Sequence, residues 1–501
     1  MKLFKCFFFW VVFLSSISVF SKPPATSTSQ NQKAGILDND SWIDANNVFM
    51  FGSNSGWFAY DQGAYFGRYD GCYFPYTSEQ DITNGLTYSV VFAAGIWIGG
   101  TDSTTGDTLI TAADYFTDFW PGPMVSGSYI ANADSDLEYR VYKLYSDSLE
   151  NNPNLDYLEW PAAQGAPADG DGNPKLTGDQ TLWSVYNDAN YGIRGSLPGS
   201  DSGMGIEIQS TLWATDTTGP EGMSIHSKYR LINKGSKTLN NLFICLWFDP
   251  DLGSVDNDLV GCDTLDDIFY CYNAGSDANY GSAPPAVGGK LIQGPIVPSL
   301  GDTAVVDSTP VPDFKNLDMY SFGRFFDGLD PFSYDWAYQY MNGLDASQGG
   351  IPYSNGTRFA VPGDPVAGTG DLDTNASDRR MMTSFGPLTF RPNDTQQIIV
   401  KLAVGQGTSA LTSITDLKNN LNYVPGPGSC CIGIRGDVDG NGTDNNILDL
   451  NYMVNDIFRG GPPSPCSLEA DIDSNGTPST ILDLNFLVND IFRGGPSPGP
   501  C

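Results

Sequence analysis

Two stretches of the 501-residue chain repeat each other: GDVDGNGTDNNILDLNYMVNDIFRGGP at Gly436–Pro462 and ADIDSNGTPSTILDLNFLVNDIFRGGP at Ala470–Pro496. The period is 34 residues, and 18 of the 25 positions from the leading Asp to the closing Gly-Gly are identical. A period this regular indicates a duplicated supersecondary unit. The sequence therefore predicts a small module built from two copies of one structure.

Each repeat begins with oxygen-bearing side chains at alternate positions of a glycine-containing loop. Asp, Asp and Asn occupy loop positions 1, 3 and 5, and a Thr at position 7 offers its backbone carbonyl. Calcium takes roughly six to eight oxygen ligands, which such a loop delivers to one centre. The closing acid lies at position 13 instead of 12, so we interpret a one-residue insertion. The predicted ligands of two calcium ions are Asp437, Asp439, Asn441, Thr443, Asp449, Asp471, Asp473, Asn475, Thr477 and Asp483.

Each loop continues into a segment with apolar residues at helical spacing, ILDLNYMVNDIF or ILDLNFLVNDIF. The Gly-Gly-Pro that follows each segment is typical of a helix C-terminus. We expect two helices with a small shared core. The predicted core positions are Ile447, Leu450, Val454, Ile457, Ile481, Leu484, Val488 and Ile491.

With these two calcium loop-helix units, residues 431–501 resemble the dockerin family, type I in particular. The resemblance implies a noncatalytic module that docks onto a cohesin-like domain of a scaffold or surface protein, and its near-symmetry implies two docking orientations. The family's partner-reading positions correspond to residues 446–448 and 480–482, which are more apolar here than a Ser-Thr pair, so the partner is not identified. Two alternatives stay open: loops that bind calcium only to hold the fold, and loops that bind no metal.

The composition of the whole chain favours strands joined by Asp-rich loops. There are 58 acidic and 25 basic residues, a formal charge of −33, and 51 of the acids are Asp. Asp favours turns and ion sites, whereas Glu favours helices. The charge excludes a general nucleic-acid-binding protein, because such binding needs cationic side chains. The single histidine, His226, excludes a three-His zinc site, and we interpret it as structural.

The N-terminal residues predict export. Lys2 and Lys5 precede an apolar stretch, Cys6–Phe20, and small residues favour cleavage after Ser21. We therefore expect a signal peptide over residues 1–21, a flexible lead over 22–39, and a secreted, extracellular or cell-surface protein with no transmembrane segment after signal removal. An uncleaved membrane anchor is the alternative.

Residues 40–424 are predicted to form a mainly β, sandwich-like region, as one unit or two subdomains. Aromatic and β-branched runs alternate there with Gly, Asp, Asn and Pro clusters. The runs Ser224–Ile232 and Leu239–Phe248 predict an antiparallel hairpin with its turn near Lys234-Gly235-Ser236. A helix is predicted over Leu411–Tyr423, and a Pro/Gly linker over 425–430 precedes the module.

Eight cysteines follow the signal segment, an even number compatible with disulfides in an oxidising compartment. The sequence does not choose among the pairings. The two groups are Cys72, Cys245, Cys262 and Cys271 in the large region, and Cys430, Cys431, Cys466 and Cys501 around the repeats.

Further acidic segments offer candidate metal sites in the large region. The segment DPDLGSVDNDLVGCD directly follows an apolar strand, and a second kind of calcium site or a solvated Asp-rich turn would explain it equally well. Its acids are Asp249, Asp251, Asp256, Asp258 and Asp263. The segment Asp169–Asn173 has a similar spacing of oxygens but lacks the turn glycine and the closing acid.

A carbohydrate-related role is a further hypothesis. Trp57, Trp120 and Trp160 are the candidate sugar-stacking residues, and Glu159 and Glu207 are candidate carboxylates for a glycoside hydrolase, which needs two. No hydrolase signature is recognisable. The segments GIWIGG, GDQTLW and DPDLG look similar to ones in uncharacterised secreted bacterial proteins and imply no activity.

Three functions follow from these patterns. The first is a secreted calcium-binding modular protein whose dockerin-like end docks a β-sandwich binding or structural region onto a cohesin-type scaffold or cell surface. The second is a polysaccharide-degrading O-glycosyl hydrolase that carries a dockerin. The third is a structural surface or matrix protein. The sequence favours a protein that is not an enzyme, with carbohydrate as an optional ligand.

Overall fold

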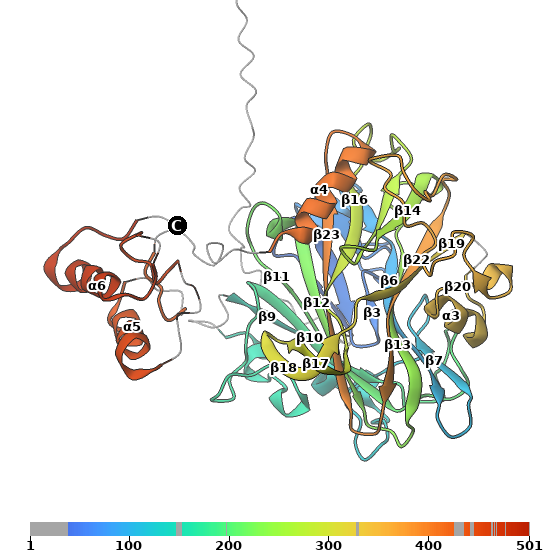
Figure 1. Ribbon diagram of the computed structural model, residues 1–501, viewed down its shortest axis with the longest axis horizontal. Coiled ribbons are helices and arrows are strands. Elements are labelled where there is room, and N and C mark those ends of the chain that lie inside the picture. The colour runs from blue at the N-terminus through green and yellow to red at the C-terminus, as the bar shows by residue number, and fades with distance from the viewer. Residues whose placement is uncertain are drawn as a thin grey trace, which may run out of the picture.

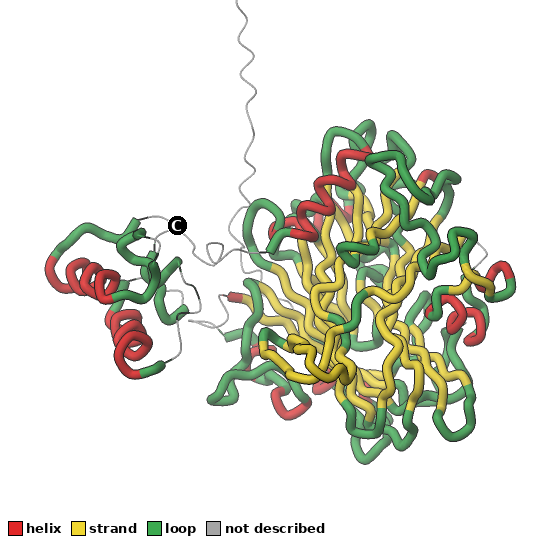
Figure 2. Tube along the Cα trace, viewed as in Figure 1, coloured by secondary structure: helices red, strands yellow, loops and turns green. Residues whose placement is uncertain are grey.

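The computed structural model describes residues 39–146, 153–196, 198–326, 330–424, 435–440, 445–461, 464, 466, 468–475 and 477–499. The signal segment 1–21, most of the lead 22–39 and the linker 425–430 lie outside these residues, as do the predicted ligands Asn441 and Thr443. The described chain is mainly β, with a few helices at its periphery and two helices in the C-terminal repeats (Figure 2).

One large sheet has ten antiparallel strands (Figure 1). Its long central strands are rich in aromatic and β-branched residues, which suit a buried pleated surface. Strands β1 and β7 pair with β2 and β6 outside the main path. The order along the path is β19 (Met319–Phe326), β22 (Arg379–Phe390), β13 (Leu239–Asp249), β6 (Ala93–Asp102), β3 (Trp57–Phe58), β2 (Phe49–Ser53), β4 (Cys72–Phe74) and β5 (Tyr88–Val91), with β1 (Asp40–Ile43) and β7 (Thr108–Ala112) beside it.

The second large sheet has nine antiparallel strands. Its order is β14 (Asp258–Asp263), β15 (Ile268–Asn273), β16 (Ala286–Gln293), β23 (Thr395–Gly405), β12 (Ser224–Asn233), β11 (Ile206–Ala214), β10 (Gln180–Asn187) and β8 (Trp120–Pro121), with β9 (Tyr142–Tyr145) paired to β10. Two small hairpins complete the strands: β17 (Ile296–Val306) with β18 (Thr309–Asn316), and β20 (Leu344–Asp345) with β21 (Ile351–Pro352).

The two sheets share one hydrophobic core, which confirms the predicted β-sandwich. Ile96 and Leu246 from the first sheet belong to the same buried cluster as Ile208, Tyr229 and Val400 from the second. Because this cluster spans both sheets without a break, the strands form one sandwich rather than two fused ones.

Helices cover parts of the outer faces. Helix α3 (Tyr334–Met341) packs on the first sheet through Tyr340 and Met341, and α4 (Ala410–Asn422) packs on the second through Ile414, Leu417 and Leu421. The prediction of a helix over Leu411–Tyr423 is confirmed, although Leu411 itself is exposed. Two short helices lie in connections between strands of the described chain: α1 (Glu79–Thr83) and α2 (Leu155–Leu158).

The predicted hairpin between β12 and β13 is wrong. Strand β12 pairs with β11 and β23, whereas β13 pairs with β6 and β22, so the two strands belong to opposite sheets. The chain crosses between the sheets at residues 234–238, where the Asn233 side chain donates to the carbonyls of Lys237 and Phe390. Apolar residues of both strands, such as Tyr229 and Leu246, lie in the core between the two sheets.

The repeats form helices α5 (Ile447–Arg459) and α6 (Ile481–Arg493). Gly460 and Gly494 end them with positive φ values of 68° and 64°, where a side chain would be strained. The predicted core face is partly wrong, because Ile447 and Ile481 are exposed and the fully buried apolar residues of the helices are Met453 and Leu487. The remaining buried members of this core are Val438, Ala470 and Ile472.

The four cysteines of the sandwich, Cys72, Cys245, Cys262 and Cys271, are buried free thiols. The expectation of disulfides there is wrong, because each cysteine fills a place in an apolar cluster and Cys245 faces the opposite side of its sheet from the others. Burial raises the pKa of all four thiols. In the repeats Cys466 is disulfide-bonded, and its partner lies outside the described residues.

Candidate calcium sites

The predicted acids of each repeat meet in the structure. Asp437, Asp439 and Asp449 form one cluster, with one carboxylate oxygen of each within 4.8 Å of the others. Asp471, Asp473 and Asp483 form the same cluster in the second repeat. The three carboxylates of each cluster are therefore close enough to contact one metal ion together. The structure thus holds two acidic clusters that fit a metal ion.

The closing acid of each loop serves the following helix as well. The Asp449 carboxylate accepts hydrogen bonds from the backbone N–H groups of Asn446, at 2.9 Å, and Asp439, at 3.3 Å. Asp483 accepts the equivalent bonds from Thr480 and Asp473, at 2.9 and 3.2 Å. Both acids are fully buried third residues of a capping box. This capping role explains why the acid lies one position later than in a twelve-residue loop.

The first cluster is electrostatically strained without a cation. The pKa of Asp449 is raised to about 6, because burial and the charges of Asp439 and Asp437 together outweigh the two backbone hydrogen bonds that lower it. A bound divalent cation would relieve this repulsion. In the second loop Asn475 donates to Asp473, and Thr477 donates its N–H to Asn475 Oδ1, so these predicted ligands lie beside the cluster.

The two loops also hold each other. Arg435 Nη1 donates to Asp471 Oδ2 at 2.8 Å, and Glu469 accepts from the backbone N–H groups of Gly436 and Asp437 at 2.7 and 3.1 Å. Arg435 and Glu469 occupy equivalent positions of the two repeats and carry opposite charges. Neither residue was predicted from the sequence to join the loops, although the repeat alignment places this charge reversal just before each loop.

A third cluster lies at one end of the sandwich. It joins Asp249 and Asp251, which the sequence predicted, with Asp378, which it did not. The other acids predicted for this site lie elsewhere: Asp258 is buried and accepts from Leu252 N–H and Asn273, Asp263 pairs with Lys418 at 2.7 Å, and Asp256 is exposed. Of the five acids in this segment, the structure thus brings two into a three-carboxylate cluster and places the other three outside it.

The Asp169 loop is a self-contained turn. Asp169 accepts from the N–H groups of Asp171 and Asn173 and from the Asn173 side chain, and these bonds lower its pKa. Among the described residues, it belongs to none of the three-carboxylate clusters. Its oxygen spacing thus forms an Asx turn.

The aromatic candidates are mostly core residues. Trp57 is buried and donates to the Asp114 carbonyl, and Trp160 is buried and donates to the Pro167 carbonyl. The expectation that these two rings are on the surface is wrong, because each packs among other aromatic side chains. Trp120 is half-buried and donates to the Ile130 carbonyl.

The carboxylates considered for hydrolysis are each paired with a cation. Glu159 lies 3.0 Å from Arg140, and the fully buried Glu207 lies 2.5 Å from Lys234. His226 contacts Glu221 at 2.9 Å and stacks on Trp213, which fits the structural role expected of it.

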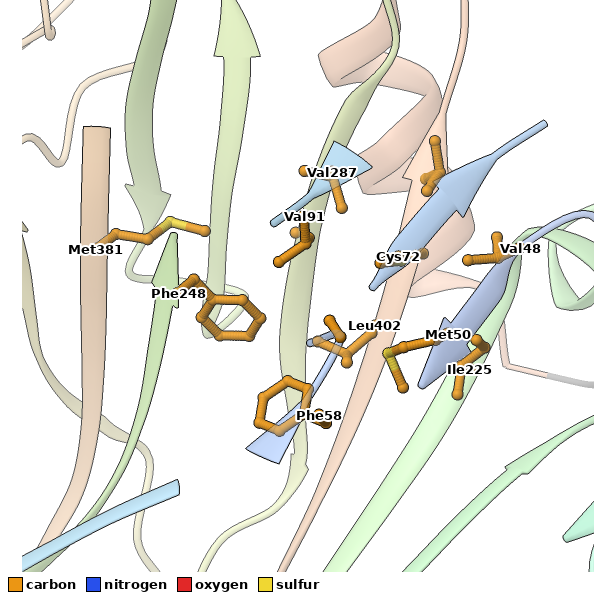
Figure 3. Close-up of a pocket in the computed structure, with 14 residues that line it drawn as sticks. Val48, Met50, Phe58, Cys72, Val91, Ile225, Phe248, Val287, Met381 and Leu402 are labelled. Carbon is orange, nitrogen blue, oxygen red and sulfur yellow. The ribbon is translucent and has the colours of Figure 1, made fainter. Parts of the chain in front are cut away.

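Two hollows in the sandwich differ sharply in character. An apolar cavity of about 20 Å³ lies between the sheets, lined by side chains such as Met50, Phe58, Phe248 and Leu402 (Figure 3). It is a packing gap and is too small for more than a water molecule. A groove of about 640 Å³ lies under the β17–β18 hairpin and includes Trp213 and the Lys228–Asp307 ion pair.

No model of a known protein family matches the chain, and no curated protein matches its sequence. Among the residues that the structure describes, no helix has the length and apolar character needed to span a membrane.

Proposed function

We propose that the chain is a secreted calcium-binding modular protein whose dockerin-like C-terminal repeats attach the β-sandwich to a cohesin-like domain of a scaffold or surface protein. One observation carries the proposal: each repeat exposes the same large apolar side chains. The exposed fractions at the helix starts are 58% for Ile447, 57% for Leu448, 57% for Ile481 and 58% for Leu482. Phe458 and Phe492 repeat this match at the helix ends.

We call these six residues the paired apolar patches. Such exposure in a small module supports a protein-binding surface, because isolated modules rarely leave contiguous apolar groups in water. The two patches are related by the repeat, so a partner that fits one fits the other after rotation. This equivalence supports the two docking orientations that the dockerin resemblance implies.

Calcium would control this surface through the closing acids. Asp449 follows Leu448 directly, Asp483 follows Leu482, and both carboxylates cap the helices that present the patches. Without a cation, three clustered carboxylates repel one another beside each helix start. We therefore expect docking to require calcium.

The test compares calcium and cohesin binding by the full chain and its variants. Asp449→Asn with Asp483→Asn should abolish tight calcium binding in the repeats and with it the binding of cohesin domains. Each Asn keeps an oxygen for the helix cap, so the variant separates charge from capping. Calorimetry of the full chain that finds no calcium binding lost in this double variant would contradict the proposal.

The patches are tested separately. Leu448→Asp and Leu482→Asp should each leave binding within a few-fold, because the other orientation remains, whereas the double variant should lose it. Leu300→Asp is the matched control, since Leu300 is an exposed leucine of the sandwich hairpin. Absence of binding to a panel of cohesin domains in saturating calcium would refute docking and leave the calcium sites to hold the fold.

A second candidate function is carbohydrate binding by the sandwich, and the groove under the β17–β18 hairpin favours it. Trp213, Lys175, Lys228 and Asn316 there supply one ring and several polar groups, the usual means of holding a sugar. A glycan array probed with the wild-type chain and Trp213→Ala tests it, with release of sugar as the readout for the hydrolase alternative. Uniform background on the array with no released sugar would leave the structural or matrix role for this region.

A further inference from the structure

Strand pairing brings the third acidic cluster together. Strand β13 ends at Asp249, β22 begins at Arg379, and the two strands are antiparallel neighbours in which Phe248 pairs with Met381. Asp249 and Asp251 therefore leave one strand at the same end of the sheet where Asp378 enters the other. One carboxylate oxygen from each of the three lies within 4.8 Å of the other two.

Asp249 is the buried centre of this cluster, with 2% of its surface exposed. Its Oδ2 accepts a hydrogen bond of 2.6 Å from the Tyr115 hydroxyl and lies 3.8 Å from Arg380 Nε. Its Oδ1 is buried and has no hydrogen-bond partner in the part of the chain that the structure describes. A buried carboxylate oxygen without a donor is costly in a protein interior, so it marks a place where a positive group is missing.

The charges around the cluster do not balance. Arg380 lies within 3.1 Å of both Asp378 and Asp330 and is the cation that faces Asp249, so one guanidinium serves these acids and Asp251. Among the residues that the structure describes, the three carboxylates of the cluster face this one guanidinium, and a divalent cation would offset the two negative charges that remain.

We propose that Asp249, Asp251 and Asp378 bind a calcium ion that ties the loop after β13 to the residue directly before β22. The donor set is made only of carboxylate oxygens, which suits a hard cation and excludes a soft one. Calcium is a hard cation that takes roughly six to eight oxygen ligands, and the three carboxylates would supply part of that set. This site lies in the sandwich, so it does not depend on the function proposed for the repeats.

Calcium stoichiometry of the full chain is the first test. The wild type should bind three ions and Asp251→Asn two, while Asp449→Asn with Asp483→Asn should keep the sandwich ion alone. Asp256→Asn is the matched control, because Asp256 is exposed on the same loop and lies outside the cluster. A stoichiometry of two in both the wild type and Asp251→Asn would overturn the site and leave Asp249 and Asp251 sharing a proton.

Terbium luminescence gives a readout that a folding defect does not imitate. All ten tryptophans precede residue 337, and the Trp247 ring lies 5.3 Å from the Tyr115 ring that contacts Asp249. Trp-excited terbium emission, displaced by calcium, should persist in the variant without repeat sites. It should disappear in Asp251→Asn and Asp378→Asn, whose folding is checked by the unchanged near-ultraviolet dichroism of the sandwich. Emission that survives in both variants would overturn the proposal.

Discussion

The acidic clusters of the repeats and of the sandwich contain three carboxylates each, but the chain assembles them differently. Asp437 and Asp449 are 12 residues apart, whereas Asp251 and Asp378 are 127 residues apart. The repeat clusters close a short loop beside a core of five fully buried apolar residues, whereas the sandwich cluster lies at the end of strands already fixed by a very large core. Carboxylates are thus brought together by a short loop in the repeats and by the pairing of distant strands in the sandwich.

Removal of calcium should have the largest and most uneven effect. Chelation is expected to unfold α5 and α6, since each ion at 100 times its Kd contributes about 2.7 kcal/mol to a module with a small core. The sandwich should keep its fold. Hydrogen exchange of residues 447–459 and 239–249, with and without chelator, measures both regions at once. Equal protection of α5 with and without chelator would show that the repeats keep their fold without calcium.

A cavity in the sandwich core tests whether that region stands without ions. Leu246 is buried between the sheets, and Leu246→Ala should lower the free energy of unfolding by about 3 kcal/mol, with or without calcium. Leu487→Ala should remove a similar amount from the far smaller core of the repeats and unfold them even with calcium. Urea unfolding monitored by Trp fluorescence for the sandwich and by helical dichroism for the repeats gives both values. A loss below about 1 kcal/mol for Leu246→Ala would show that the core relaxes around the cavity.

The sandwich also has ion pairs of its own that need no metal. Burial raises the pKa of Glu221, but hydrogen bonds from His226 and Lys401 outweigh burial and lower the pKa below its usual value. A lowered carboxyl pKa stabilises the fold above the unfolded value of 4.5 and loses that effect as the pH falls through the folded value. Glu221→Gln should therefore cost about 2 kcal/mol at neutral pH and nothing in strong acid.

Stability of wild type and Glu221→Gln between neutral and acidic pH checks this prediction. The gap between them should close as the pH drops below 4.5 and should not change with calcium. A gap that is constant with pH would mean that the variant acts through packing alone.

The smallest effect is expected at the contact between the repeats. Arg435→Gln removes a charged hydrogen bond to Asp471 and should lower the free energy of unfolding of the repeats by about 1 kcal/mol. Arg459→Gln is the control, because Arg459 is exposed at the end of α5. Thermal melts in saturating calcium should separate the two variants. Equal melting temperatures would show that the loops do not support each other through this pair.

The repeats could be predicted closely because their information is local. Loop spacing located six acids that the structure brings together, and apolar periodicity located both helices. The exact buried face was missed, because the helices turn Met453 and Leu487 towards the core and leave Ile447 and Ile481 to the surface. Helical spacing predicts an apolar face on the helix. Which residues of that face become buried depends on the segment that packs against it.

For the sandwich, only the fold class could be predicted from the sequence. Strand positions followed from composition, but β12 and β13 went to opposite sheets instead of pairing. Strand partners depend on contacts between distant segments, and no local pattern records them. For the same reason Asp378 was invisible as a partner of Asp249, since only the pairing of β13 with β22 makes them neighbours.

The four buried thiols set a condition on how the sandwich reaches its fold after the proposed export. A reduced cysteine is exposed to oxidants until the strand that carries it is covered, whereas the raised pKa of the buried thiol protects it afterwards. Cys72, Cys245, Cys262 and Cys271 come from four different strands, so all of β4, β13, β14 and β15 must be packed before that protection is complete. An exported chain would therefore have to bury these thiols before they are oxidised. Its yield would then depend on the rate of folding as much as on the final stability.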